Sequence, residues 1–155
     1  MKNRFEIKEI PTDDMNSVAP VWEKLNELHH SLSYDFKERY RTMTWETRKK
    51  KLLERSIELH IEGVYNLPEN ELIGYCICSI EKADPKSGEI DSIYIDEAYR
   101  KSGLGRQLMN NAIAWFSVKG VETQKLMVAC GNEQVFDFYR QFGFKPLFTG
   151  FQKIS

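Results

Sequence analysis

The chain of 155 residues lacks any apolar run long enough to cross a bilayer, and no hydrophobic stretch typical of a secretory signal follows Met1. Its three cysteines are too few for the disulfide framework of a small secreted domain. It also lacks an excess of either charge, because 22 basic and 23 acidic residues give a net charge of −1. We therefore expect a cytoplasmic protein whose main partner is neither a nucleic acid nor a membrane surface.

Hydrophobic residues make up 41% of the sequence and charged residues 29%, as in an ordinary soluble globular protein. The length suits one domain, which can bury about two-thirds of the surface of its unfolded chain. No internal repeat, linker or low-complexity segment divides the sequence. We expect a single domain over residues 1–155.

The hydrophobic pattern alternates between the period of a strand and that of a helix. The expected strands are a first one around Phe5 and Ile7, then 56–65, 71–82, 89–95 and 124–130, and a last one after Phe144. The expected helices are 12–33, 44–56, 104–119 and one that starts near Val135. This order of elements predicts an α/β fold with a mixed sheet.

Residues 90–106 combine a strand, a turn with two glycines and the start of an amphipathic helix. The first N–H groups of a helix lack partners within it, and the helix dipole favours an anion beside them. Gly103 and Gly105 allow the backbone to approach such an anion closely. Positive side chains come from Arg100, Lys101 and Arg106. The segment therefore predicts a site for a phosphorylated ligand.

Two common phosphate-binding motifs do not fit this segment. A Walker-type loop needs a Lys-Ser/Thr pair after its second glycine, whereas Arg106 and Gln107 follow Gly105. A dinucleotide-binding fingerprint needs a third glycine, and Leu108 occupies that position. The pattern that remains is Arg-x-x-Gly-x-Gly, which begins at Arg100.

A second motif, Asn-x-x-x-x-x-Phe-Tyr-x-x-x-Gly-Phe, runs from Asn132 to Phe144. In their order and spacing, the two motifs resemble those of the GNAT superfamily of N-acetyltransferases. The first resembles its coenzyme A pyrophosphate loop, and the second resembles its fifth strand and the helix that follows. The resemblance covers residues 70–150 and, more loosely, 4–32. It implies the acyl-CoA N-acyltransferase fold, a mixed and mostly antiparallel β-sheet flanked by helices on both faces.

This resemblance implies acetyl-CoA as a co-substrate and no metal. Backbone amides at 101–106 would hold the pyrophosphate, and Asn132 and the backbone of 93–95 would contact the pantetheine arm. The implied cofactor-binding residues are Ile93, Tyr94, Ile95, Arg100, Lys101, Ser102, Gly103, Leu104, Gly105, Arg106 and Asn132. The alternatives are a solvated surface turn for the loop and a helix N-cap for Asn132.

In this family the amine attacks acetyl-CoA directly, without a covalent enzyme intermediate. Tyr139 matches the family's tyrosine, which implies that it hydrogen-bonds the departing thiolate; the alternative is a core aromatic. Glu89 and Asp91 alternate along one strand and therefore share a face. The resemblance implies that one of them accepts the amine proton through water, and the alternative is a polar, exposed strand start.

Other reactive side chains lack a comparable match. Cys76 and Cys78 point the same way along a strand, without further ligands at metal-binding spacing, so burial as small apolar residues is expected. Cys130 ends a predicted strand without a base beside it. Ordinary helix-surface or strand positions are expected for His29, His30, His60 and the basic run 48–51.

The acceptor is less well defined than the donor. The resemblance places it between the segment 28–40 and the final strands near 148–151. Acidic residues at that end, among them Asp35 and Glu38, would attract a cationic amine, so we expect a primary amine on a small molecule. The alternatives are a protein or peptide N-acetyltransferase with an open groove and a non-catalytic CoA-binding regulatory module. A homodimer is compatible with the resemblance.

Overall fold

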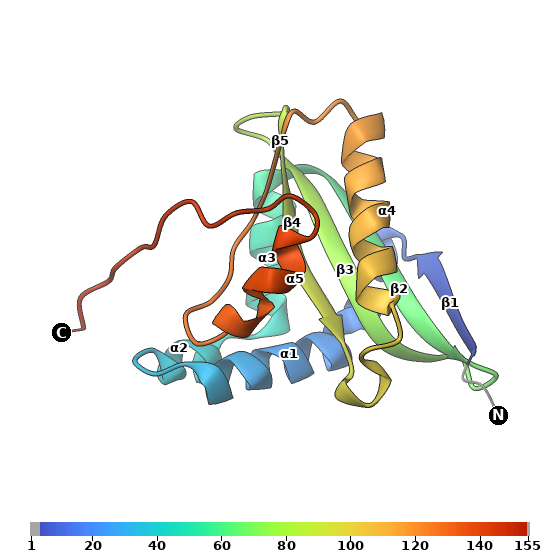
Figure 1. Cartoon of the computed structure of the whole chain (residues 1–155), viewed down its shortest axis with the longest axis horizontal. Helices are drawn as coiled ribbons and strands as arrows, with labels where there is room; N and C mark the ends of the chain where they lie inside the picture. Colours follow the sequence, from blue (N-terminus) through green and yellow to red (C-terminus); the bar gives the residue numbers. More distant parts are fainter. Residues whose placement is uncertain (1–3, 155) are drawn as a thin grey trace.

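One sheet organises the computed structural model, which describes residues 4–154 (Figure 1). In this part of the chain its strands lie in sequence order, β1-β2-β3-β4-β5. Their bounds are β1 (Arg4–Glu9), β2 (Ser56–Leu67), β3 (Glu71–Glu81), β4 (Ser87–Ile95) and β5 (Thr123–Leu126). Neighbouring strands from β1 to β4 are antiparallel, whereas β5 lies parallel to β4. The expected α/β fold with a mixed, mostly antiparallel sheet is confirmed.

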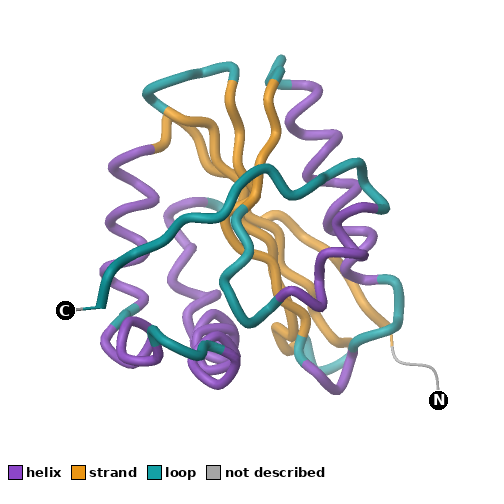
Figure 2. Tube along the Cα trace, turned by 60° about the vertical axis from the view of Figure 1, so that its left-hand side comes forward, coloured by secondary structure: helices purple, strands orange, loops and turns teal. Residues whose placement is uncertain are grey.

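Helices lie on both sides of the strands, as expected (Figure 2). The α-helices are α1 (Ala19–Leu32), α2 (Lys37–Thr42), α3 (Trp45–Arg55), α4 (Leu104–Val118) and α5 (Phe136–Arg140). Short 3-10 helices are η1 (Thr12–Val18), η2 (Glu97–Tyr99) and η3 (Glu133–Val135). On the α4 side, Phe116 shares a core with Cys76; on the other side, Trp22 of α1 and Leu52 of α3 share a core with Ile77. Because alternate side chains of β3 enter these two cores, the strand is buried on both faces.

The ends of the helices follow local signals in the sequence. Thr44 caps α3, since its side-chain oxygen accepts a hydrogen bond from the Thr47 backbone N at 3.2 Å. The segment 12–33, expected as one helix, divides into η1 and α1. Pro20 stands in the first turn of α1, where its missing N–H costs no hydrogen bond. No helix among residues 4–154 combines the length and the apolar character that crossing a membrane requires.

Three expected elements differ from the structure. A short helix, α2, forms within a segment that shows no clear periodicity, and β5 ends at Leu126 instead of residue 130. The strand expected after Phe144 is wrong, because 145–154 contain no strand and extend away from the sheet (Figure 1). Pro146 and Gly150 interrupt the alternation there, and a strand without a paired neighbour gains no ladder of hydrogen bonds. Phe151 is consequently 98% exposed.

The ladder between β3 and β4 contains a β-bulge at Asp91. Ser92 pairs with Ile77 and Ile90 pairs with Cys78, so that Asp91 has no opposite residue in this ladder. The parallel pairing of β4 with β5 also stops here, at Ile90 and Leu126, although β4 continues to Ile95. Bulges end regular pairing and redirect side chains. The sheet therefore opens on one side of β4 immediately beyond the bulge.

Candidate active site

A cavity of about 60 Å³ lies where β4 and the chain after β5 part. Its walls come from α1, from β4, from the loop after β5 and from α5. The lining residues are Leu25, His29, Ile90, Asp91, Ser92, Ile93, Leu126, Met127, Val128, Ala129, Asn132, Val135 and Tyr139. Since α1 packs on one face of the sheet and α5 on the other, the cavity lies between the two layers at the level of the sheet itself.

The loop after β5 is held close to the C-terminal end of α1. Gly131 has a φ of +102°, and a Cβ at this position would overlap the carbonyl oxygen of Leu32. Only a glycine accepts both this backbone conformation and this approach. The contact keeps residues 127–132 over the cavity instead of in the sheet.

Asn132 and Tyr139 face the cavity from the segment that carries the second motif. Asn132 precedes η3 but makes no side-chain capping bond, and its Oδ1 is buried with no hydrogen-bond partner among the described residues. Burial raises the pKa of Tyr139 to about 12, and the nearby Cys76 adds to this rise. The phenol therefore stays neutral at any ordinary pH and can donate a hydrogen bond into the cavity.

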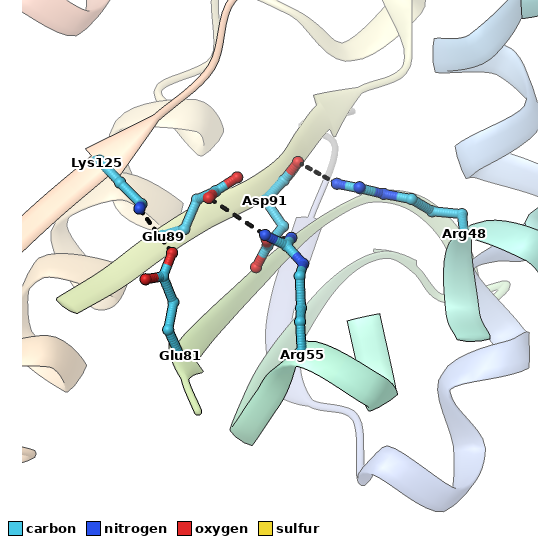
Figure 3. Close-up of polar contacts among 6 residues, drawn as sticks. All are labelled: Arg48, Arg55, Glu81, Glu89, Asp91 and Lys125. Atoms are coloured by element: carbon cyan, nitrogen blue, oxygen red, sulfur yellow. Dashed lines mark hydrogen bonds and ion pairs between the residues drawn. The ribbon is translucent and has the colours of Figure 1, made fainter. Parts of the chain in front are cut away.

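The two carboxylates of β4 share one guanidinium (Figure 3). Arg55, at the end of α3, lies 3.4 Å from Glu89 Oε1 through Nη1 and contacts Asp91 Oδ1 through Nη2. Arg48 donates a second hydrogen bond to the backbone oxygen of Asp91 at 3.1 Å. Glu89 and Asp91 thus share a face, as predicted, while Arg48 is not the solvated helix residue that the basic run suggested.

Asp91 is a buried charge with incomplete hydrogen bonding. Its side chain is 0% exposed, and Oδ2 has no hydrogen-bond partner within residues 4–154. Burial raises the pKa of Asp91 to about 6; the nearby Ser79 hydroxyl opposes this rise, the negative charge of Glu89 adds to it, and Arg55 and Arg48 oppose it. Arg55 therefore compensates a carboxylate that burial would otherwise destabilise. Its contact with the bulge depends on how α3 packs, which no local pattern in the sequence reveals.

The loop of the first motif leads into α4 at one end of the sheet. Gly103 is the N-cap with a φ of +83°, and Lys101 also adopts positive φ, at 65°. The first backbone hydrogen bond of α4 runs from Gln107 N to Gly103 O at 3.1 Å, so the amides before Gln107 lie at the open end of the helix. Residues 101–103 are exposed. This geometry fits an anion beside the start of α4.

Two of the three positive side chains of this loop, those of Arg100 and Arg106, have other contacts in the structure. Arg100 donates from Nε to Ile95 O at 2.9 Å, and its guanidinium lies 5.2 Å from the Tyr94 ring centre. Arg106 contacts Gln141 and lies over the Phe142 ring. Both guanidinium groups thus hold the loop against the rest of the protein. The backbone of the loop and the exposed side chain of Lys101 are the parts that are open to a ligand.

The cavity brings together Asp91, Ile93, Asn132 and Tyr139 from the predicted site residues. The side chain of Ile95 is buried in the α4 core, and that of Tyr94 packs at the edge of the opposite core. Their roles in ligand binding stay predictions. No cluster of three or more His, Cys, Asp or Glu side chains suited to a metal occurs in the described chain.

His29 lines the cavity from α1; sequence reasoning placed it in the acceptor segment 28–40 but gave its side chain only an ordinary helix-surface position. Its position on the helix gives no local sign of this, because the cavity forms only when α1, β4 and α5 come together. The expected contribution of 148–151 is also absent from the lining, since Phe148 and Phe151 are exposed on the extended C-terminal segment. On this side the cavity is thus lined by α1 and the loop after β5.

Solved structures of other proteins share this architecture. The PaiA N-acetyltransferase from Thermoplasma acidophilum, in complex with coenzyme A, superposes with a TM-score of 0.72 at 22% identity, covering 95% of this chain and 93% of that one. The BH1408 protein from Bacillus halodurans gives 0.71 at 18% identity, covering 97% and 99%. An aminoglycoside acetyltransferase, meta-AAC0020, from an uncultured soil metagenomic sample gives 0.67 at 16% identity, covering 97% and 96%. These likenesses show an acetyltransferase fold.

The family is shown by the sequence itself. Residues 22–144 match the model of the acetyltransferase (GNAT) family, and the chain belongs to that family. An uncharacterized N-acetyltransferase of Methanocaldococcus jannaschii, MJ1207, is 33% identical over 69 residues, which is 44% of this chain. The match spans 30% of the length of that relative.

Gly131→Ala tests how the loop after β5 is seated on α1. Gly143→Ala is the matched control, because Gly143 also has positive φ, +90°, but has open space around it. We expect Gly131→Ala to lower the free energy of unfolding by roughly 1–3 kcal/mol more than the control does, since it adds a steric overlap to the same backbone cost. Urea titrations of both variants measure this difference. Equal losses would show that the loop does not rest on Leu32.

Asp91→Asn tests the cost of the buried charge. Since the pKa of Asp91 is about 6 in the folded protein and near 3.9 in an unfolded chain, its contribution to stability is complete below about pH 4 and is lost as pH rises through 6. A shift of about two pKa units corresponds to roughly 3 kcal/mol. The same pKa values set the range of the effect at about pH 4 to pH 7. Over this range we expect the free energy of unfolding of the wild type to fall by this amount relative to that of Asp91→Asn.

Urea titrations at intervals across this range measure the difference. Asp137→Asn is the control, because the Asp137 side chain is 93% exposed. It should show no comparable trend. A difference between wild type and Asp91→Asn that does not change with pH would contradict the assigned burial of the charge.

Proposed function

We propose that this chain is an acetyl-CoA-dependent N-acetyltransferase that acetylates a primary amine on a small molecule, by direct attack within a ternary complex. The observation that carries the proposal is the cavity at the parting of β4 and β5, which is lined by Tyr139 and Asn132. It lies on the same sheet whose β4 leads to the open start of α4. Membership of the acetyltransferase (GNAT) family supports this assignment.

The donor fits the residues that are present. The exposed backbone at 101–103 and the first amides of α4 suit the pyrophosphate, because they supply N–H groups and the positive end of the helix dipole. The backbone of 93–95 lies beyond the last pairing with β5, so within the described chain no strand covers it on that side and it suits the pantetheine arm, although Ile95 O already accepts a hydrogen bond from Arg100. The buried, unpartnered Oδ1 of Asn132, among the described residues, can accept a hydrogen bond from an amide of the same arm. The acetyl group then lies in the cavity.

Tyr139 is assigned to the departing thiolate. A phenol with a pKa of about 12 does not readily give its proton to a thiolate, whose conjugate thiol has a pKa near 8.5 if it resembles cysteine. The phenol O–H instead donates a hydrogen bond to sulfur as negative charge develops there. This contact is stronger in the transition state than in the ground state, so it lowers the barrier without tightening the binding of acetyl-CoA.

The small volume of the cavity, about 60 Å³, favours a slender group such as a primary amine at the reacting carbon. The similar solved structures include one named as an aminoglycoside acetyltransferase, which supports a small-molecule acceptor. Glu89 and Asp91 stay candidates for the proton acceptor. Their shared contact with Arg55 also gives them a second role, in holding β4 against α3.

Tyr139→Phe tests the role of the phenol. We expect kcat to fall by roughly tenfold or more, because the hydrogen bond to the thiolate is lost, while the Kd for acetyl-CoA stays nearly unchanged. Release of free thiol measures kcat, and isothermal titration calorimetry measures Kd. Tyr65→Phe, on β2 and away from the cavity, is the matched control and should leave both values intact. Unaltered turnover in Tyr139→Phe would remove this residue from the mechanism.

A panel of amines tests the activity itself. Polyamines, aminoglycosides, amino acids and peptides with free N-termini are each incubated with the protein and acetyl-CoA, and free thiol is measured. We expect at least one small primary amine to stimulate thiol release over slow hydrolysis, and calorimetry to show binding of acetyl-CoA. Stimulation by peptides alone would indicate a peptide acetyltransferase. Binding without stimulation by any amine would indicate a regulatory module, and absence of binding would overturn the proposal.

A further inference from the structure

His29 occupies a defined place in the wall of the cavity. It lies in the last turn of α1, on the side of the cavity opposite to the layer that carries Tyr139. Its imidazole stacks on the ring of Tyr40 with 5.5 Å between ring centres and 29° between planes. Asn26 donates a hydrogen bond from Nδ2 to the backbone oxygen of Tyr40 at 2.7 Å, which fixes the stacking partner against α1. Packing therefore holds the imidazole in one orientation.

The surroundings of His29 favour a neutral ring. Its Nδ1 is buried and has no hydrogen-bond partner among residues 4–154, so a proton on this nitrogen would find no acceptor in the described chain. Burial also lowers the pKa of His29 below its ordinary value. Because an imidazolium carries a proton on both nitrogens, both effects disfavour the charged form. At neutral pH the ring keeps a lone pair that can take up a proton.

The other titratable side chains at the cavity or next to it are held by contacts of their own or stay protonated. The Asp91 side chain from β4 is fully buried and paired with Arg55, and Glu89 beside it is 10% exposed and paired with the same guanidinium. Tyr139 from α5 stays protonated, since burial raises its pKa to about 12. Tyr40 from α2 offers the face of its ring to His29. Among the titratable residues that line the cavity in the described chain, His29 is therefore the one with neither an ion pair nor a retained hydroxyl proton.

We propose that His29 is the residue that accepts the proton of the acceptor amine; this inference rests on the proposed function. An ammonium that enters the cavity gives one proton to the free ring nitrogen of His29. The resulting amine attacks the thioester carbonyl, the C–N bond forms and the C–S bond breaks. The second amine proton goes to the departing thiolate, which Tyr139 holds, and His29 later releases its proton to water. The products are the N-acetylated amine, coenzyme A as the free thiol, and one proton.

His29→Gln tests this role through the dependence of kcat/KM on pH, with the amine that gives the fastest thiol release. We expect kcat/KM of the variant to fall roughly 100-fold near pH 7. The limb of the pH profile that reflects ionisation of the imidazole should disappear with it. The Kd for acetyl-CoA, measured by calorimetry, should change less than about twofold. His30→Gln is the matched control, because His30 adjoins His29 on α1 without lining the cavity. It should keep the wild-type profile.

The wild type supplies a second measurement that does not depend on how the variant folds. The His29 imidazole is titrated by NMR, and its midpoint should agree with the limb of kcat/KM within about half a pH unit, as expected for a general base. A midpoint elsewhere, or a full rate and an intact limb in His29→Gln, overturns the inference and leaves the proposed function standing. Loss of the limb in Glu89→Gln or Asp91→Asn, with His29→Gln unaffected, would place the base on β4 instead. A wild type that no amine stimulates ends both proposals.

Discussion

The contact of Arg55 and Arg48 with the bulge in β4 is the interaction on which the site depends. Arg55 compensates two carboxylates at the point where β4 leaves its pairing with β5, and Arg48 binds the backbone oxygen of Asp91. A buried carboxylate without such a partner would be strongly destabilising. These ion pairs therefore have a structural role: they join α3 to β4 and keep the sheet open beside that strand. The cavity exists because the two strands do not close over it.

Because the sheet is open beside β4, residues from both of its faces reach the same cavity. The start of α4 and the residues of α5 stand on one face, where they suit the donor. Helix α1 stands on the other face and brings His29 to the same cavity. In the proposed reaction, donor and acceptor therefore approach the reacting carbon from opposite sides. Gly131, pressed against the end of α1, keeps the intervening loop thin enough for this arrangement.

Features with local causes were predictable from the sequence, and features with distant causes were not. The two motifs located the start of α4 and the helix of Tyr139, because glycine conformation and helix periodicity act over a few residues. Arg55 and His29 reach the site from helices 36 and 62 residues away from Asp91, counted along the chain, and their contacts depend on packing. The prediction of the last strand failed for a related reason: Phe148 and Phe151 are residue types that favour strands, but pairing requires a neighbour that the segment does not have in the described chain.

The bulge also separates Asp91 from the alternation of its strand. Ile90 pairs with Cys78 and Ser92 pairs with the next residue, Ile77, so the residues on either side of Asp91 keep the faces that a regular strand would give them. Removing Asp91 would therefore leave Ile93 and Ile95 in the α4 core and Tyr94 at the edge of the opposite core. The register of β4 would survive, but the buried carboxylate that contacts Arg55 would be lost. Identity, more than length, is what this position must preserve.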